Sequence, residues 1–219
     1  MEFLFVPLVS LLAVVLGITI HEFSHALSAE LLGDSTARYM GRLTLNPIAH
    51  FDPFGGLMIL VSSLTGFGFG WGKPVPVNPN RLRFGPRVGM ALTSLAGPFS
   101  NILLATLLGA PLRLINPMPP LLWQALITAA SVNAALAVFN LLPVPPLDGF
   151  SVLQGLFSTV RARWAMEATN FMDRIASQGP LIFMLLLFAD RALPSPGIIW
   201  TILGPLHRAL MWLILNAGA

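Results

Sequence analysis

The sequence predicts an all-α polytopic membrane protein with about five transmembrane helices. Of its 219 residues, 55% are apolar and 10% are charged, whereas about 25% are charged in an average soluble domain. Several apolar runs approach the roughly 20 residues that a helix needs to cross a bilayer. A re-entrant or interfacial segment over 54–70 and short β-strands near 36–46 complete the predicted fold. This composition excludes a disordered chain, a coiled coil and an ordinary soluble enzyme.

The first predicted helix covers residues 3–31. An apolar run extends from Phe3 to Ile20 and is long enough to span the bilayer. Gly33-Asp34 is expected to end the helix, because glycine is favoured just after a helix C-terminus. Met1 is followed by an acidic residue rather than by a basic segment, so we do not expect a signal peptide here.

The segment that follows is predicted to be largely non-helical. The alternation of residue types within 36–46 favours two short strands, broken at Gly41. Residues 54–70 are apolar but contain five glycines. Prolines at three positions of 73–79 rule out a helix and predict an extended segment.

The remaining predicted helices follow the apolar pattern of the chain. Three stretches are long enough to span: 88–112, 121–142 and 197–215. A shorter helix is expected over 147–160. Residues 161–178 are the most polar part of the chain, and 181–188 are apolar but short.

Basic residues predict the orientation in the membrane. Nine of the 12 lysines and arginines lie in 33–87 and 146–178, while the connection 113–120 holds only Arg113. Cytoplasmic loops are enriched in Lys and Arg, so we expect 33–52, 71–87 and 146–178 in the cytoplasm and the N-terminus outside. Both flanks of 54–70 then lie on one side, which favours a re-entrant or interfacial segment. A short span with a weak charge bias is the alternative.

The sequence His21-Glu22-Phe23-Ser24-His25 indicates a metal site. Side chains at i and i+4 of a helix share one face, so both imidazoles can bind one Zn²⁺. The glutamate between them can act as a general base on a zinc-activated water. Three ionisable groups directly after an apolar span are costly in a membrane and are usually functional. The alternative is that they mark the end of the helix at the headgroups.

A catalytic zinc site requires a third protein ligand and an open position. Asp148 is the best candidate, because it follows a proline-rich break at the end of a predicted span, where exposed backbone is tolerated only beside protein or a water-filled cavity. Its alternative role is to cap the next helix. His50 and Asp52 lie in a turn and remain candidates, whereas Glu30 is expected to face away from His21.

Topology supports this choice of ligand. If 54–70 does not cross the membrane, the span 88–112 leads out, 121–142 leads back, and Asp148 returns to the side of His25. If 54–70 does cross, Asp148 lies on the opposite side. The charge pattern and the proposed ligand set therefore require the same topology.

Three asparagines in apolar helices are further candidates. Asn140 precedes the proline-rich break, and its amide is expected to hold substrate or to donate to a developing oxyanion. Asn133 is expected to form hydrogen bonds between helices. For Asn101, which follows Gly97-Pro98, both interpretations remain open.

The two motifs together resemble the site-2 protease family of intramembrane zinc metalloproteases. HEFSH (21–25) is similar to its first motif and NLLPVPPLDG (140–149) to its second, and the resemblance extends over about 10–160, including LAGPFSN and GWGKPVPVNP. It implies zinc ligands His21, His25 and Asp148, the general base Glu22 and an assisting Asn140. The chain 1–219 is expected to be one integral membrane protease domain, with its catalytic core in about 1–160 and C-terminal helices over 161–219.

The expected function is hydrolysis of peptide bonds in or near transmembrane segments, as in regulated intramembrane proteolysis, with one Zn²⁺ per chain. Its partners are transmembrane protein substrates and the lipid bilayer of the cell membrane, and the active site is expected toward the cytoplasm. The chain has no basic stripe interleaved with aromatic residues, so nucleic acid is not an expected partner. A non-proteolytic zinc-bearing membrane scaffold and a metal transporter are the alternatives.

Overall fold

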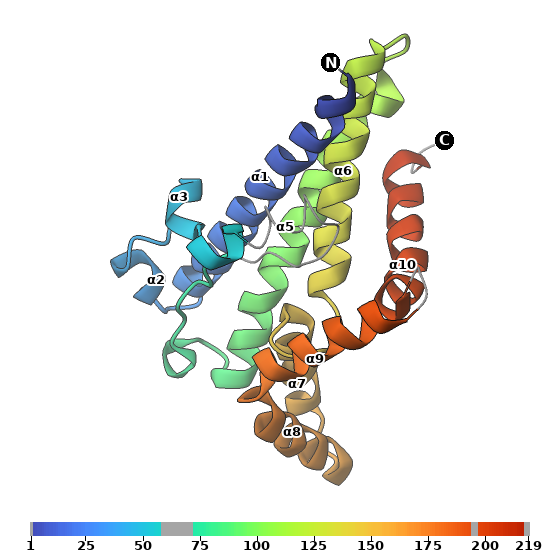
Figure 1. The fold of residues 1–219 in the computed structure, drawn as a ribbon. Helices are drawn as coiled ribbons and strands as arrows, with labels where there is room; N and C mark the ends of the chain where they lie inside the picture. Colours follow the sequence, from blue (N-terminus) through green and yellow to red (C-terminus); the bar gives the residue numbers. More distant parts are fainter. Residues whose placement is uncertain (1, 58–71, 194–196, 217–219) are drawn as a thin grey trace.

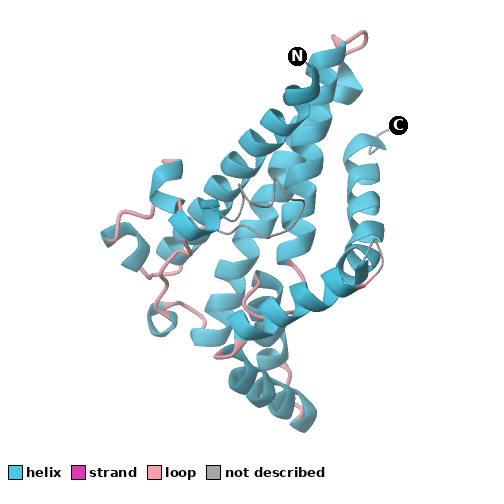
Figure 2. Ribbon diagram, in the orientation of Figure 1, coloured by secondary structure: helices cyan, strands magenta, loops and turns pink. Residues whose placement is uncertain are grey.

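All regular secondary structure in the described part of the chain is helical. The computed structural model describes residues 2–57, 72–193 and 197–216, and among these residues all regular structure is α-helix or 3₁₀-helix (Figure 2). The long helices are α1 (Glu2–Leu31), α5 (Pro86–Leu114), α6 (Pro120–Asn140) and α10 (Gly197–Asn216). The shorter ones are α2 (Thr36–Tyr39), α3 (Pro47–His50), η1 (Pro79–Arg81), α7 (Asp148–Thr159), α8 (Arg163–Ala176) and α9 (Gly179–Ala192).

Four helices are long and apolar enough to cross a membrane: Leu4–Leu31, Pro86–Leu114, Pro120–Asn140 and Gly197–Asn216. A fifth span results if α8 and α9, which meet at a bend of 83°, are counted together. Their bounds agree closely with the predicted spans. The protein is therefore a multi-pass membrane protein.

The long helices form a bundle in which α1, α5 and α6 lie side by side and α10 covers α6 and α5 (Figure 1). Where α5, α6 and α10 meet, Ala105 and Ala134 are fully buried against Ile214. Small side chains at such positions let helices approach closely, which is how membrane helices gain packing energy.

The direction of the helices agrees with the predicted topology. α1 ends, and α5 begins, at the end of the bundle opposite the N-terminus, so these two helices are antiparallel (Figure 1). The chain between them therefore makes no net crossing. Of the predicted re-entrant or interfacial segment 54–70, residues 58–70 lie outside the described residues.

The predicted β-strands near 36–46 were wrong. Residues 36–39 form the short helix α2, residues 40–46 form turns and bends, and α3 follows. The Asp34 carboxylate accepts hydrogen bonds from the hydroxyl and the backbone N–H of Thr36, and the Asn46 side chain accepts one from Ile48 N–H. The Asn46 bond is the N-terminal cap of α3, and the Asp34 bonds form a local turn at the start of α2. Such bonds between side chains and nearby backbone N–H groups favour single helical turns over strands.

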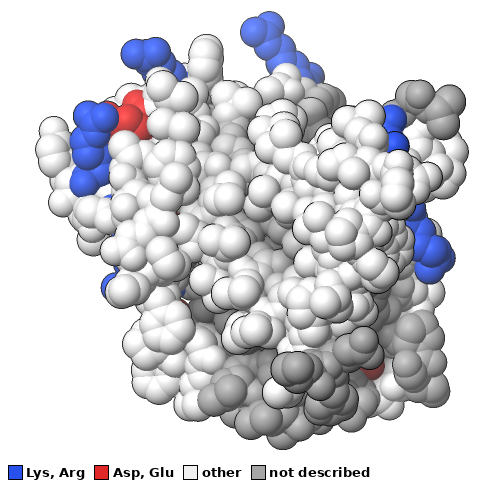
Figure 3. All heavy atoms as spheres, turned by 90° about the horizontal axis from the view of Figure 1, so that it is seen from above, with Lys and Arg blue, Asp and Glu red and all other residues white. Residues whose placement is uncertain are grey.

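The end of the molecule that carries the N-terminus exposes few charges. Figure 3 looks down on this end, and the charged side chains visible there lie around the rim, whereas the middle of the view is uncharged.

Candidate metal centre

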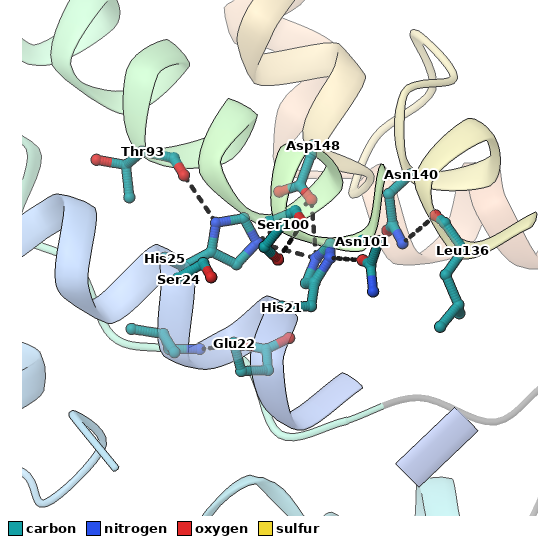
Figure 4. Close-up of polar contacts among 12 residues, drawn as sticks. His21, Glu22, Ser24, His25, Thr93, Ser100, Asn101, Leu136, Asn140 and Asp148 are labelled. Atoms are coloured by element: carbon teal, nitrogen blue, oxygen red, sulfur yellow. Dashed lines mark hydrogen bonds and ion pairs between the residues drawn. The ribbon is translucent and has the colours of Figure 1, made fainter. Parts of the chain in front are cut away.

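His21 and His25 point into the centre of the bundle from one face of α1. Their Nε2 atoms lie 3.0 Å apart, and both side chains are buried. They occupy successive turns of the same helix, as the HEFSH spacing predicts. Figure 4 shows both rings directed toward Asp148 at the start of α7.

Asp148 completes a triangle of donor atoms. Its Oδ2 atom lies 3.1 Å from His21 Nε2 and 3.3 Å from His25 Nε2. The proline-rich turn after α6 brings it there, and Gly149 is necessary for this turn because a Cβ at that position would overlap the Leu141 carbonyl group. The N-cap of α7 is Leu147, and Asp148 lies inside the helix. Asp148 is therefore not the capping residue that the alternative interpretation required.

Hydrogen bonds fix the orientation of both imidazole rings. His25 Nδ1 lies 2.7 Å from the Thr93 carbonyl oxygen, which can only accept, so this nitrogen is the donor. His21 Nδ1 lies 2.7 Å from Asn101 Oδ1. In neutral rings with protonated Nδ1 atoms, both Nε2 lone pairs face Asp148, which is the arrangement that metal-binding histidines adopt.

This donor set fits a zinc ion. Two imidazole nitrogens and a carboxylate oxygen are typical ligands of a catalytic zinc. Tetrahedral bonds of normal length would separate the ligand atoms by about 3.3 Å, close to the separations found here. Asp148 Oδ2 is also buried and, within the described part of the chain, lacks a hydrogen-bond partner. Among the described residues, these three side chains form the group that could hold a metal ion.

Gly97 of α5 makes room for the two rings. A Cβ at this position would lie 2.5 Å from His25 Cε1 and Nε2 and 2.6 Å from His21 Cε1. Real Cβ contacts are essentially never this short. α5 can therefore lie against the histidines only because residue 97 lacks a side chain.

Glu22 lies on the other side of the rings from Asp148 (Figure 4). Its Oε2 atom accepts a hydrogen bond of 3.1 Å from the backbone N–H of Val75, in the extended segment 72–78. This segment is held in turn by Asp34, whose Oδ2 accepts from Asn78 N–H at 2.6 Å. The predicted extended conformation of 73–79 thus extends to the start of η1 at Pro79, and it orients the candidate base.

Comparison with known proteins identifies the family. The chain is 36% identical, over 99% of its length and 92% of the relative, to the Bacillus subtilis protein named "Putative zinc metalloprotease YwhC". Residues 118–187 also match the sequence profile of peptidase family M50.

The chain belongs to peptidase family M50.

This is the site-2 protease family, and its zinc metalloproteases use the cofactor Zn²⁺, for which the donor set above is suited. Two further relatives match part of the sequence. It is 34% identical over 175 residues to "Putative zinc metalloprotease Rip2" of Mycobacterium tuberculosis and 33% identical over 142 residues to the protein of that name in Mycolicibacterium smegmatis. These matches span 63% and 53% of the relatives. No solved structure matches the chain significantly.

The other residues considered as metal ligands from the sequence lie outside this group of three side chains. The His50 ring contacts the Thr44 carbonyl oxygen at 2.8 Å, and the Asp52 carboxylate accepts from Gly55 N–H at 2.8 Å. Both therefore stabilise local turns and are not in the metal-binding group found among the described residues. Glu30 forms an ion pair with Arg38 at 3.0 Å and faces away, as expected.

Two of the three asparagines form hydrogen bonds behind the candidate metal centre, in a network that the sequence did not reveal. Asn101 is fully buried; its Nδ2 donates to Gly17 O at 3.1 Å and to Asn133 Oδ1 at 3.0 Å, which leaves Oδ1 to accept from His21. Asn133 thus forms the expected bond between helices. A Cβ at residue 17 would lie 2.7 Å from Asn133 Oδ1, so Gly17 provides space for the network. Asn140 donates to the Leu136 carbonyl oxygen of its own helix at 2.9 Å.

Proposed function

We propose that His21, His25 and Asp148 hold one Zn²⁺ in an intramembrane protease that cleaves transmembrane proteins. The observation that carries this proposal is the meeting of their three ligand atoms, all within 4.8 Å of one another, from helices far apart in the sequence. The M50 family supplies the reaction class, and the apolar bundle supplies the membrane setting. Zinc, when bound, polarises a carbonyl group and lowers the pKa of water.

Glu22 is the proposed general base. Its Oε2 is occupied by Val75 N–H, which orients the carboxylate and leaves Oε1 to accept a proton from the attacking water. The same carboxyl group then donates that proton to the nitrogen of the leaving amine. Because Glu22 neighbours His21 on α1 and is half-buried, the proton is transferred near the ligands and under partial shielding from bulk water.

Asn140 is the proposed substrate-contacting residue. It is half-buried at the last turn of α6, before the turn that leads to Asp148. One N–H of its amide is bonded to Leu136, which fixes the side chain and leaves the second N–H and the carbonyl oxygen for a peptide group. Such a fixed amide can stabilise a developing oxyanion without reorganisation.

The proposed orientation places the active site toward the cytoplasm and the N-terminus outside. The end of α1 after the metal centre and the start of α5 lie at one end of the bundle (Figure 1). Four arginines lie in the segment between these two helices or in the first turn of α5: Arg38, Arg81, Arg83 and Arg87. The positive-inside rule places such an end in the cytoplasm of a cell membrane.

The test is a cleavage assay in proteoliposomes with candidate transmembrane substrates. Glu22→Gln removes the base but none of the proposed ligands, so we expect cleavage to be abolished while zinc remains bound. Glu167→Gln, which changes an exposed carboxylate of α8, is the matched control and should cleave at the rate of the unchanged protein. Turnover that persists in Glu22→Gln would refute this role of Glu22. Absence of cleavage by the unchanged, zinc-loaded protein with every substrate would favour a zinc-bearing scaffold.

A further inference from the structure

Helix α8 has three distinct faces. Ala165, Thr169 and Met172 are buried, and α8 packs against α7. A second face carries Trp164 and Phe171, two turns apart and 57% and 60% exposed. A third, polar face consists of Arg163, Glu167, Asn170 and Arg174. A helix inside a globular protein would bury its aromatic residues, and here they remain uncovered by the described chain.

Two side chains tie α8 to the beginning of a membrane span. α5 crosses from Pro86, and Arg87 in its first turn forms an ion pair of 2.6 Å with Asp173 of α8. The other oxygen of Asp173 accepts from the Gln154 amide of α7 at 2.7 Å. α8 is therefore fixed beside the first turn of a helix that is long enough to span, where we expect the boundary between hydrocarbon and water.

The charges of α8 suit that boundary. Arg163 is paired with Glu167 at 2.9 Å and Asp173 is paired with Arg87. Arg161 and Arg174 are exposed and form no ion pair with any residue that the structure describes. Two guanidinium groups, one on α8 and one just before it, thus lack an ionic partner among the described residues, and anionic headgroups are their natural counter-charge.

We propose that α8 lies in the plane of the membrane–water interface as a lipid-binding anchor. Trp164 and Phe171 enter the boundary between headgroups and acyl chains, and Arg161 and Arg174 contact anionic headgroups. Amphipathic helices of this composition bind membranes in this way. Four ionisable side chains, Arg163, Glu167, Asp173 and Arg174, make α8 unsuited to cross the hydrocarbon, and a bend of 83° separates it from α9.

The anchor lies one helix away from the metal centre. α7 begins at Asp148 and ends at Thr159, and its Phe157 ring meets the Trp164 ring edge-on at a centroid distance of 5.6 Å. Lipid contact of α8 therefore fixes the far end of the helix that carries Asp148. The proposed lipid surface is distinct from the metal centre and does not depend on catalysis.

Spin labelling of the full-length chain tests this proposal directly, because the sequence contains no cysteine. Trp164→Cys and Phe171→Cys place a label on the aromatic face, and Glu167→Cys and Asn170→Cys are matched controls on the polar face. All four positions are exposed, so labels should be tolerated, which the zinc content of each variant checks. Collision with oxygen, which partitions into lipid, is compared with collision with a water-soluble nickel chelate in phosphatidylcholine vesicles with and without phosphatidylglycerol.

We expect oxygen to dominate at positions 164 and 171 and the nickel chelate to dominate at 167 and 170. Phosphatidylglycerol should deepen the first two labels, and Arg161→Gln with Arg174→Gln should remove this effect. Four labels that are all accessible to the nickel chelate would overturn the proposal, as would four labels that all lie in lipid. Labels at 164 and 171 that neither reagent reaches would also overturn it, because a second copy or another segment would then cover this face.

Discussion

The Nδ1 atom of His21 lies 2.7 Å from the Oδ1 atom of Asn101, across the contact between α1 and α5. Asn101 cannot turn its amide around without losing its bonds to Gly17 and Asn133. The two helices are thereby joined through the ring that presents Nε2 to the metal centre. Residues behind the candidate ligands thus determine the direction of their lone pairs.

Replacement of Asn101 should weaken zinc binding. Asn101→Leu removes the acceptor for His21 and leaves a buried N–H without a partner, so we expect zinc affinity to fall by about 10–100-fold. Asn101→Asp keeps the acceptor and should lose less. Competition with a chromophoric chelator measures the change. Thr106→Val, on an exposed face of α5, is the control, and equal affinities for Asn101→Leu and this control would contradict the role given to Asn101.

Gly97→Ala should disturb the metal centre by direct overlap with both imidazole rings. The added methyl group needs space that the rings occupy, and such overpacking costs about 1–3 kcal/mol. We expect a lower melting temperature and less zinc per chain. Gly204→Ala in α10 is the matched change, since a Cβ there meets only the end of Arg208 at 3.3 Å. If both variants keep full zinc content, the close approach at Gly97 is unimportant.

Asp34 should make stability depend on pH in the acidic range. Burial alone raises the pKa of its carboxyl group, but hydrogen bonds from Thr36 and Asn78 and the charge of Arg81 hold the pKa below its ordinary value. A lowered pKa in the folded state stabilises the protein above about pH 4, and this contribution is lost as the pH falls through the folded pKa.

Asp34→Asn should therefore reduce stability by about 1–3 kcal/mol at neutral pH, and the difference from the unchanged protein should vanish in acid. Thermal unfolding of the metal-free proteins at a series of pH values measures this. A difference that is constant with pH would show that the charge of Asp34 is unimportant.

The sequence was sufficient to predict the three candidate ligands that the structure brings together, and insufficient to predict the residues that support them. His21 and His25 lie four positions apart on a helix whose length was evident from the apolar run, so their shared face followed from helix geometry. Asp148 was predicted because the charge distribution and the order of the spans place it on the same side of the membrane as His25. Asn101 was left open, because its partners Gly17, His21 and Asn133 lie on two other helices and no local pattern indicates which faces meet.

The error near 36–46 has a local cause. Alternating residue types favoured strands, but Asp34 and Asn46 satisfy the first N–H groups of single helical turns. A hydrogen bond between a side chain and the backbone N–H two residues later depends on backbone geometry, and these bonds outweighed the weak alternation. The segment also lacks a neighbouring strand in the described part of the chain, without which a strand has no partner for its backbone groups.

Removal of the metal should abolish cleavage and loosen the contact of α1 with α7. Binding to the folded state alone stabilises a protein by about 4 kcal/mol at a ligand concentration 1,000-fold above Kd. We expect a chelator to lower the melting temperature and to stop cleavage, and zinc to restore both. Magnesium prefers oxygen ligands in octahedral geometry and should restore neither; equal restoration by magnesium would refute a zinc centre made of two histidines and one carboxylate.

The zinc content of purified Asp148→Ala protein, measured by mass spectrometry beside the unchanged chain and Glu22→Gln, tests the central claim most directly. The unchanged chain and Glu22→Gln should each hold one zinc ion per chain, because the glutamate is not a ligand. Asp148→Ala should hold far less, because only the two histidines of α1 remain. An unchanged zinc content in Asp148→Ala would show that Asp148 is not part of the metal centre.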